Sequence, residues 1–512
     1  MAQQLANIDI VAPGRLGLNR ESRGRLLPPT FATEATNFVL NRQGLLAARA
    51  GQTDQTGTAI GSSPNIESLF EYVKSDASTE IIVGWDGGLS NSIDDPAGND
   101  ISGTLTDTNG TWWFQNFNDK CLAFQSGQKL AIYTGSTFAT VSESSGTAST
   151  SGIAGCVFGR VWQVDGSDGG NLLYSGLLDE ADWGGAGAGS IDFNNIWTDG
   201  QDRITAIVGF NGALVVFGLR HIVFIIDGSN SELGLDPTNA YVTDVISGTG
   251  CVDQHTIQPI GETDIVFLSQ NGLQSLGRLI QERSNPSKTI SKYIRTELLE
   301  SYRGATAGTI RSCYSPEEGL YLLTFPASKT YAFDMRWLYT DEQGDLISPV
   351  FTWDLTPTAL VSRENGDILM GGAGEVFSYS GPTDNGTDIS LTFETPWLDL
   401  GEDLGNRLKI LKKIGAIVFS SFNGNMVIKW YTDFKTTSNT RTKEFSSVSS
   451  GSEWGIAEWG LDEFGGGAAS QKIFRVPARA TGQYFKIGFT VDVDSTFEVQ
   501  QLELLAKIGR LA

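Results

Sequence analysis

The sequence predicts a mainly β protein: a β-propeller of six or seven blades, with an extended N-terminal arm and a C-terminal β-sandwich or jelly-roll-like domain. Three observations lead to this prediction. A unit made of an apolar strand, a glycine turn and a second apolar strand recurs along the middle of the chain. Glycine is abundant (61 of 512 residues) and aromatic residues are plentiful, as in β proteins with many tight turns. The pattern changes at both ends, which sets two flanking regions apart.

Residues 1–50 are predicted to form the extended arm. They contain Pro13, Pro28 and Pro29 and lack the apolar periodicity of a long helix. Six arginines stand against three acidic residues in this segment. We expect such an arm to lie along another surface, either of its own chain or of a neighbour.

Residues 51–385 are predicted to form the propeller. Successive turn glycines lie 40 to 60 residues apart, at Gly87, Gly127, Gly169, Gly212, Gly272, Gly319 and Gly366. A four-stranded blade takes about 40–50 residues, so the spacing fits one turn in each blade. One of the seven turns can belong to an insertion, which leaves six blades open. A helix is expected at Ser291–Tyr302, with Ser291 as its N-cap.

Residues 386–512 are predicted to form the sandwich domain. Apolar and polar residues alternate in segments such as Leu411–Phe419 and Tyr484–Val493, which is typical of half-buried strands. A loop rich in glycine and tryptophan, Ser449–Gly467, separates these strands. The alternation favours two packed sheets.

The net charge of −23 is unevenly distributed. Residues 1–50 carry +3, residues 401–512 carry +2, and residues 51–400 carry −28. Between Gly51 and Ser275 only six basic residues accompany 27 acidic ones. This argues against nucleic acid held on the surface of the repeats, because phosphates are bound by cations. Solubility of a large glycine-rich β protein is an alternative explanation of the acidity.

No constellation of residues predicts a catalytic, cofactor or metal site, so we expect no enzyme activity and no cofactor. The two histidines, His221 and His255, are not part of a metal or catalytic motif, and His221 lies within an apolar strand. The loop at residues 165–171 is rich in oxygen donors but lacks the spacing of an EF-hand, so a hairpin turn is expected. The four cysteines are expected to be reduced. No apolar stretch is long enough to span a bilayer, and no secretory signal is evident, so no membrane insertion is expected.

Three parts of the chain carry sets of residues that recur together in one protein family. In the arm they are Phe31, Asn37, Arg49 and Gly51. In the repeats they are Tyr174, Trp183, Asp199, Gly200, Asp202, Ile204, Arg220 and Ile222. In the C-terminal region they are Trp454 and Trp459, which follow Thr395–Gly401. These patterns resemble the tail nozzle proteins of short-tailed bacteriophages, which are also called tail tubular protein B-like proteins and are related to proteins that stabilise packaged DNA.

The resemblance implies a structural virion protein rather than an enzyme. It implies a homo-hexameric tube below the portal and the tail adaptor protein, which conducts and retains genomic DNA during ejection and anchors tail fibres or spikes. Double-stranded DNA would pass through without specific binding. The protein would be found in the phage tail, and in the host cytoplasm during assembly. Family members are often larger, so the resemblance does not extend to fibre-docking and gate loops.

The resemblance gives the acidity of the repeats a physical role. A wall of carboxylates repels the phosphates of a moving duplex and offers few cations that would slow it. We expect Asp165, Asp168, Asp199 and Asp202 to belong to such a channel lining. The basic arm is expected to dock on an acidic neighbour.

Two other functions fit a propeller. A receptor- or glycan-binding adhesin of the tail would present an exposed, aromatic-lined pocket. A carbohydrate-active enzyme would hold two carboxylates about 5–10 Å apart at the propeller centre. Six-fold rings in electron micrographs would favour the nozzle over both alternatives.

Overall fold

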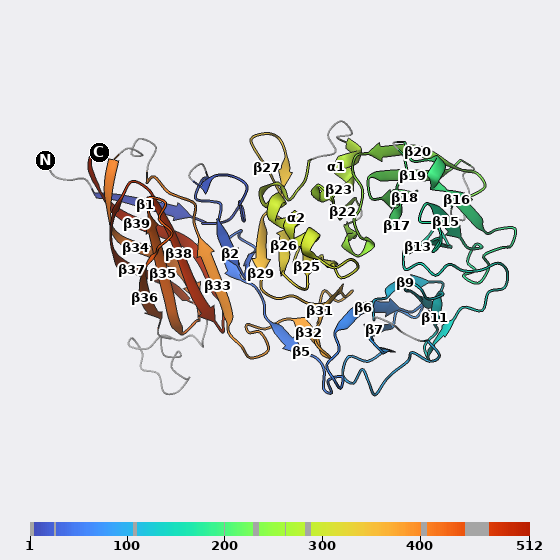
Figure 1. Ribbon diagram of the computed structural model, residues 1–512. Helices are drawn as coiled ribbons and strands as arrows, with labels where there is room; N and C mark the ends of the chain where they lie inside the picture. The colour runs from blue at the N-terminus through green and yellow to red at the C-terminus, as the bar shows by residue number, and fades with distance from the viewer. Residues whose placement is uncertain are drawn as a thin grey trace.

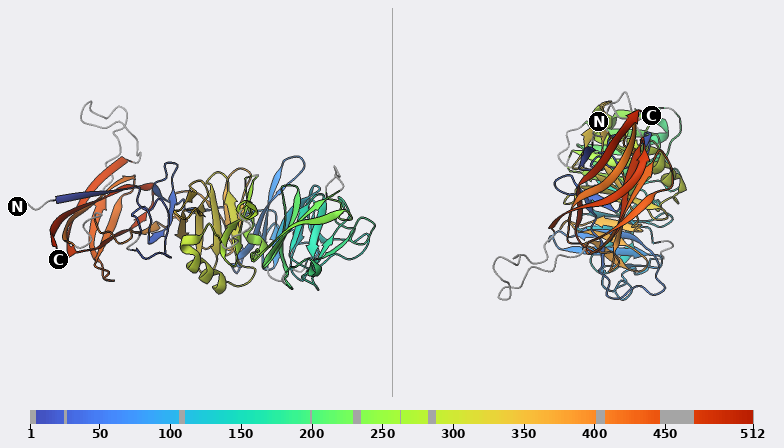
Figure 2. Two further views of the ribbon diagram at one scale, coloured as in Figure 1. Left: turned by 90° about the horizontal axis from the view of Figure 1, so that it is seen from above. Right: turned by 90° about the vertical axis from the view of Figure 1, so that its left-hand side faces the viewer.

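The computed structural model describes residues 5–24, 27–105, 110–198, 200–228, 235–261, 263–281, 288–400, 407–445 and 470–511. Strands are the dominant regular structure in these residues and helices are few, which confirms the mainly β class. The molecule is elongated in both Figure 1 and Figure 2. Two sheets of long strands lie at one end together with both chain termini, and small sheets fill the rest (Figure 1).

Seven groups of antiparallel strands follow one another in the part that we call the small-sheet region, residues 52–379. The first three groups are β6 (Ile66–Val73), β7 (Thr79–Trp85) and β8 (Gly88–Ser90); β9 (Trp113–Phe117), β10 (Lys120–Phe124), β11 (Ala131–Tyr133) and β12 (Phe138–Thr140); and β13 (Ala154–Val157), β14 (Arg160–Val164), β15 (Asn171–Tyr174) and β16 (Gly189–Asp192). The next two are β17 (Ile204–Phe210), β18 (Ala213–Gly218), β19 (His221–Asp227) and β20 (Ala240–Ser247); and β21 (Gln258–Ile260), β22 (Asp264–Ser269) and β23 (Gly272–Ser275). The last two are β24 (Arg311–Ser315), β25 (Leu320–Phe325), β26 (Lys329–Asp334) and β29 (Val350–Trp353); and β30 (Ala359–Ser362), β31 (Ile368–Gly371), β32 (Val376–Tyr379) and β5 (Gln52–Asp54).

Each group contains one of the seven turn glycines, but the glycines do not mark the same turn. Gly87, Gly127, Gly169 and Gly272 lie at the connection between the second and third strands of their groups, whereas Gly212, Gly319 and Gly366 lie between the first and second. The longest gap, from Gly212 to Gly272, therefore runs from a first turn to a second turn. Asn211 and Gly212 both have positive φ, +48° and +74°, as the Asn-Gly hairpin signal predicts.

The first strands of the groups lie next to one another around a common centre. β6 contacts β9, β9 contacts β13, β13 contacts β17, and β24 contacts β30, which contacts β6 again. Between β17 and β24 the sequence of contacts passes through the short 3-10 turn η3 (Gln254–Thr256), and β21 also contacts β24. The outermost strand of the last group, β5, precedes the first group in the chain.

At the other end of the molecule, two sheets pack on each other; we call this the two-sheet region. One sheet has the order β3-β4-β39-β34-β37, with β1 also paired to β39. The other continues from β24-β25-β26-β29 through β2 to β33-β38-β35-β36. The strands are β1 (Leu5–Val11), β2 (Glu34–Thr36), β3 (Phe38–Leu40), β4 (Leu46–Ala48), β33 (Ile389–Glu394), β34 (Arg407–Ser420), β35 (Gly424–Thr432), β36 (Asn439–Phe445), β37 (Ser470–Gly482), β38 (Phe485–Val493) and β39 (Phe497–Leu511). Their buried faces share one core, which includes Phe393, Val418, Trp430, Phe489 and Leu504.

The N-terminal arm lies along its own chain, one of the two surfaces expected for it, and its docking on an acidic neighbour stays a prediction. β1 pairs along β39, and β4 also pairs with β39. β2 pairs antiparallel with β33 and parallel with β29, so the arm joins the two regions within one nine-stranded sheet. The arm's backbone groups need partners, and these strands supply them.

Helices are short in the described residues. The helix expected at Ser291–Tyr302 is present as the 3-10 turn η4 (Lys292–Ile294) and α2 (Arg295–Gly304), and α1 spans Leu276–Gln281. Ser291 stands at the N-cap position of η4 but makes no capping hydrogen bond, because its hydroxyl accepts from the Leu273 N–H at 3.0 Å instead. A two-stranded ribbon of β27 (Tyr339–Thr340) and β28 (Leu346–Ile347) completes the elements named here. No helix among the described residues is long and apolar enough to cross a membrane.

Candidate functional site

The junction between the two regions is built around Arg49. Its side chain has no exposed surface and makes two hydrogen bonds to the Asp384 carboxylate, at 2.8 and 2.7 Å. A third bond joins it to Asp354 at 3.2 Å, and its Nε donates to the Asn37 side-chain oxygen at 3.0 Å. Arg49 therefore ties the arm to Asp354, which directly follows β29, and to Asp384, which lies five residues after the end of β32.

The other arm positions of the family pattern support the same junction. Asn37 has φ +65°, and its side-chain NH₂ donates to the Ser390 carbonyl at 2.8 Å. A Cβ on Gly51 would lie 1.9 Å from the Thr383 carbonyl oxygen, so only glycine fits there. Phe31 packs edge-on against Tyr293, with ring centroids 5.2 Å apart. These contacts give the arm pattern a structural explanation.

The remaining pattern positions are also structural where the chain is described. The Tyr174 ring lies 5.3 Å from that of Trp162, and Trp183 is buried, with its Nε1 donating to the Glu180 carbonyl at 2.9 Å. Arg220 is exposed, and its backbone N–H donates to Asp202 at 2.8 Å. Trp454 and Trp459 lie outside the described residues, as does the loop Ser449–Gly467.

Asp202, an expected channel-lining residue, is instead a buried hydrogen-bonding centre. Its side chain and that of His221 are each only 4% exposed, and Oδ2 lies 2.9 Å from His221 Nδ1. The carboxylate also accepts backbone N–H groups of Leu219 and Arg220, at 3.1 and 2.8 Å. Burial alone would raise the pKa of Asp202, but the hydrogen bonds from His221 and the backbone hold it below its ordinary value. Asp202 therefore stabilises the turn between β18 and β19. Its pairing with His221, the histidine 19 residues later that contacts it, was not predicted from the sequence.

Asp165 and Asp168 form the hairpin turn that the sequence predicts between β14 and β15. The Asp165 carboxylate accepts from the Ser167 N–H at 2.8 Å, and this bond lowers its pKa. Asp168 is exposed and accepts from the Gly170 N–H at 2.9 Å. Asp199 lies outside the described residues. The channel lining stays a prediction for Asp165 and Asp168, since it concerns an assembly of several copies.

Most of the few cations in the acidic part of the chain have hydrogen-bond or ion-pair partners within the chain. Lys74 pairs with Glu80 and Lys120 with Glu180, while Lys129 lies 2.7 Å from Glu143. Arg160 is buried and donates to the Ser175 carbonyl at 2.7 Å. Four of the six basic residues between 51 and 275 are thus committed within the chain, and the exposed charge of this surface is dominated by carboxylates.

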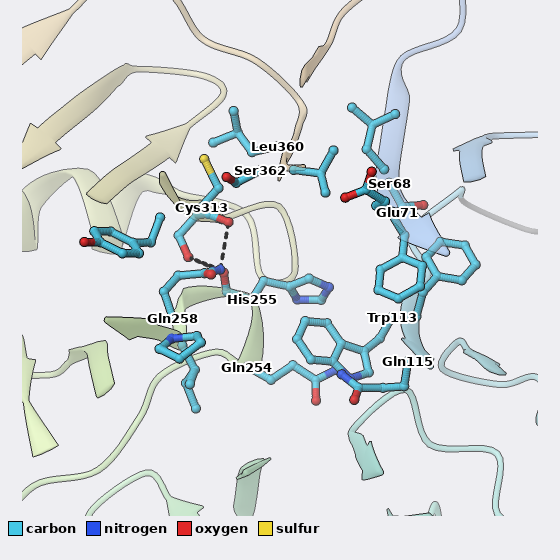
Figure 3. A pocket seen from close by; sticks show the side chains of 18 of the residues that line it. Ser68, Glu71, Trp113, Gln115, Gln254, His255, Gln258, Cys313, Leu360 and Ser362 are labelled. Carbon is cyan, nitrogen blue, oxygen red and sulfur yellow. Dashed lines mark hydrogen bonds between the residues drawn. The ribbon is translucent and has the colours of Figure 1, made fainter. Parts of the chain in front are cut away.

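A cavity of about 680 Å³ lies where the seven groups of strands meet (Figure 3). The first strand of every group contributes to its wall: β6, β9, β13, β17, β21, β24 and β30. Apolar side chains such as Leu69 and Leu360 line it together with the aromatic rings of Phe70 and Trp113. We call it the axial cavity.

Polar contacts around the axial cavity hold neighbouring groups together. His255 Nδ1 lies 2.9 Å from the Asp253 carboxylate, and the His255 ring meets Trp113 of β9 edge to face at 5.1 Å. The Ser312 hydroxyl of β24 donates to the His255 carbonyl at 2.7 Å, and Gln258 donates to the Ser312 carbonyl at 3.0 Å (Figure 3). His255 and the residues it contacts therefore link the groups that begin with β9, β21 and β24.

Two carboxylates close to the cavity are held by partners from other strands. Glu71 accepts from the Glu364 N–H at 2.6 Å and from Arg363 at 3.4 Å. Glu67 lies 3.9 Å from the buried Arg311, and burial raises the pKa of Glu67 despite this cation. In the described part of the chain, no group of three or more His, Cys, Asp and Glu side chains is arranged to hold a metal ion.

No family model matches this chain, and no curated protein matches its sequence. Solved structures are similar only at low identity. The computationally designed Ika8 protein is 12% identical over 64% of this chain and 99% of its own, with a TM-score of 0.35. The WD40 β-propeller domain of Doa1 is 10% identical over 64% and 96%, with a TM-score of 0.35. Kluyveromyces lactis Hsv2 is 9% identical over 56% and 98%, with a TM-score of 0.30. Similarity at this level assigns neither a fold nor a function.

Proposed function

We propose that this protein is a tail nozzle subunit of a short-tailed bacteriophage, a structural component that forms a hexameric tube for DNA. The observation that carries the proposal is the charge of the small-sheet region. Its first part has 27 acidic residues against six basic ones, and four of those six cations have partners within the chain. The resemblance of the arm, the repeats and the C-terminal tryptophans to nozzle proteins points in the same direction.

The charge suits a conduit for a polyanion. Each cation that contacts a phosphate releases counterions and adds to binding, so a wall with few free cations lets a duplex slide. Carboxylates repel the duplex and keep it centred. The acidity therefore favours transport of DNA over its capture.

In this proposal the seven groups of strands are the blades of a seven-bladed propeller. One turn glycine per group, first strands that follow one another around the axial cavity, and the closure of the last group by β5 support seven blades over six. The arm favours a role as a rigid subunit of a tube wall. β2 and Arg49 join the propeller to the two packed sheets and so stiffen the subunit.

The decisive experiment is electron microscopy of the purified protein, alone and with the tail adaptor protein of the same phage. We expect six-fold rings or tubes in at least one of the two samples. A gel-shift assay at low salt should show no binding of duplex DNA. Monomers in both samples, or tight DNA binding, would refute the nozzle.

A glycan-binding adhesin is the second candidate, and one observation favours it. The axial cavity has the volume of a small-molecule site and several aromatic residues in its wall, Phe70 and Trp113 among them. A glycan array probed with monomeric protein tests this function. Specific binding that is lost in Trp113→Ala, with no ring formation, would favour the adhesin over the nozzle.

A further inference from the structure

The outer face of the six-stranded sheet carries an unusual row of apolar residues. Val11 and Ile473, exposed by 65% and 64%, are the two most exposed large hydrophobic residues that the structure describes. The register places them in one row, because Val11 is opposite Gln501, Gln501 opposite Ile417, and Ile417 opposite Ile473. Directly opposite residues of antiparallel strands share a face, so the row crosses four strands on one side of the sheet.

Cations flank this row. In the next row, Arg475 lies over Gly415 and pairs with Glu503 at 2.7 Å. Lys413 and Arg479 are exposed on the same two strands. Residues 407–445 and 470–511, which form strands of both sheets, carry 14 basic and six acidic residues, a net charge of +8. On the outer face itself the cations are accompanied by acids, because the exposed Asp9 lies opposite Glu503 in the register. We call this surface, with Val11, Ile417 and Ile473 at its centre, the basic sheet face.

A loop in the small-sheet region has the complementary character. Leu177 and Leu178, between β15 and β16, are 41% and 57% exposed, and the exposed Asp179 follows them. Leu178 has φ +54°, a left-handed conformation that leucine rarely adopts, and its N–H donates to the Gly159 carbonyl at 2.7 Å. Both leucine side chains lie against Gly159, yet each stays more than 40% exposed, and glycine would hold the same left-handed backbone with less strain. We call residues 177–179 the leucine loop.

The two surfaces cannot meet within one molecule. The sheet of β34, β37 and β39 lies at one end of the molecule, and β15 and β16 lie near the other (Figures 1 and 2). A contact between them must join two copies through different surfaces, and such contacts close into rings when the rotation between copies allows it.

We propose that the leucine loop of one copy docks on the basic sheet face of the next copy. Apolar side chains would meet at the centre, and Asp179 would face Arg479 and Lys413 at the rim. The overall charge of the two regions, acidic for the repeats and basic for the sheet, favours this orientation and disfavours like-with-like contacts. This inference rests on the proposed assembly of the subunit into a ring.

Mass photometry of the full-length protein tests the apolar half of the contact. Ile473→Ser and Leu178→Gly should each raise the dissociation constant of the assembly at least tenfold. Leu178→Gly also relieves the left-handed strain, so its Tm should stay equal or rise while assembly weakens. The control is Leu338→Ser, an equally polar change at a 39% exposed leucine outside both surfaces, which should leave assembly unchanged.

A charge exchange tests the rim. Asp179→Lys and Arg479→Glu should each weaken assembly, and the double variant should recover it, because every copy carries both surfaces. In the wild type the Asp179 carboxylate accepts a hydrogen bond from the Ala181 N–H at 2.9 Å. Asp179→Asn keeps an oxygen for this bond but loses the charge, so its loss of assembly should be intermediate.

The outcomes separate this contact from the nozzle itself. Wild-type rings that are insensitive to all these substitutions overturn the contact and leave the nozzle standing. If the variants form normal rings but no longer bind another tail protein, the basic sheet face docks that protein instead. This result also overturns the contact between copies. A wild-type protein that stays monomeric, alone and with its adaptor, contradicts the nozzle.

Discussion

The small-sheet region and the two-sheet region are both antiparallel, yet they bury their side chains in different ways. In the small-sheet region the buried residues divide into separate clusters, each shared between neighbouring groups of strands, such as β14 and β15 with β17 to β19. In the two-sheet region one large cluster runs between strands as long as β34 and β39, with 14 and 15 residues, and it continues into β22, β23, β25 and β26 of the small-sheet region. Damage to one of the smaller clusters should therefore stay local, whereas damage to the large cluster should spread through both regions.

The largest expected effect is at the junction where the two regions meet. Arg49→Ala would remove a fully buried guanidinium with two hydrogen bonds to Asp384 and one each to Asp354 and Asn37, which costs roughly 3 kcal/mol. We expect a lower Tm in calorimetry. Arg49→Lys keeps the charge but loses the bidentate hydrogen bonds, so its Tm should lie between those of the wild type and Arg49→Ala. An unshifted transition in Arg49→Ala would contradict the junction.

The next largest effect concerns a single turn of the small-sheet region. Asp202→Ala removes the acceptor of His221 and of two backbone N–H groups, at a cost of about 2–3 kcal/mol. Because the folded protein lowers the pKa of Asp202, its contribution is present above the unfolded value of about 3.9 and is lost as the pH falls below it. Denaturant titrations at pH 3 and pH 7 should therefore differ less in Asp202→Asn than in the wild type. An equal difference in both proteins would exclude this role.

A smaller effect is expected from a methyl group at the junction. Gly51→Ala places a Cβ against the Thr383 carbonyl and should cost about 1–3 kcal/mol. Gly61→Ala is the matched control, since nothing lies within 4 Å of the added Cβ. Its free energy of unfolding should change by less than about 0.5 kcal/mol. Similar values for the two variants would mean that the backbone at residue 51 adjusts freely.

The smallest effect is expected on the surface of the two-sheet region. Arg475 pairs with Glu503, but the arginine side chain is 56% exposed, so Arg475→Gln should cost only about 0–1 kcal/mol. The loss should shrink further in 1 M salt, where surface charges are screened. A loss above about 2 kcal/mol in thermal unfolding would mean that this pair is part of a larger network.

Local signals in the sequence predicted local structure well. The seven turn glycines each fall in a separate group of strands, and the Asn211-Gly212 turn has the predicted positive φ. The helix near Ser291 was found, but its cap was not, because the hydroxyl bonds to the Leu273 N–H of a neighbouring strand. Only the fold brings that donor close.

Contacts between distant segments could not be predicted. Arg49 and its partner Asp384 are 335 positions apart, so the positive charge of the arm suggested a neighbour rather than the same chain. Asp202 was expected to line a channel, since neither its burial nor its bond to His221 is visible in the sequence. The axial cavity likewise depends on seven segments that meet only in the folded protein.

The pairing of β1 with β39 also sets the timing of folding. Val11 of β1 is opposite Gln501 of β39, so 490 residues are synthesised between these two partners. At roughly 5–20 residues per second this takes on the order of 25–100 s, and β1 lacks its partner strand throughout. The small-sheet groups can form as they emerge, whereas the six-stranded sheet closes only once β39 has been made. A nascent chain that stalls before β39 is complete would therefore expose an open sheet edge, which makes it a target for chaperones and proteases.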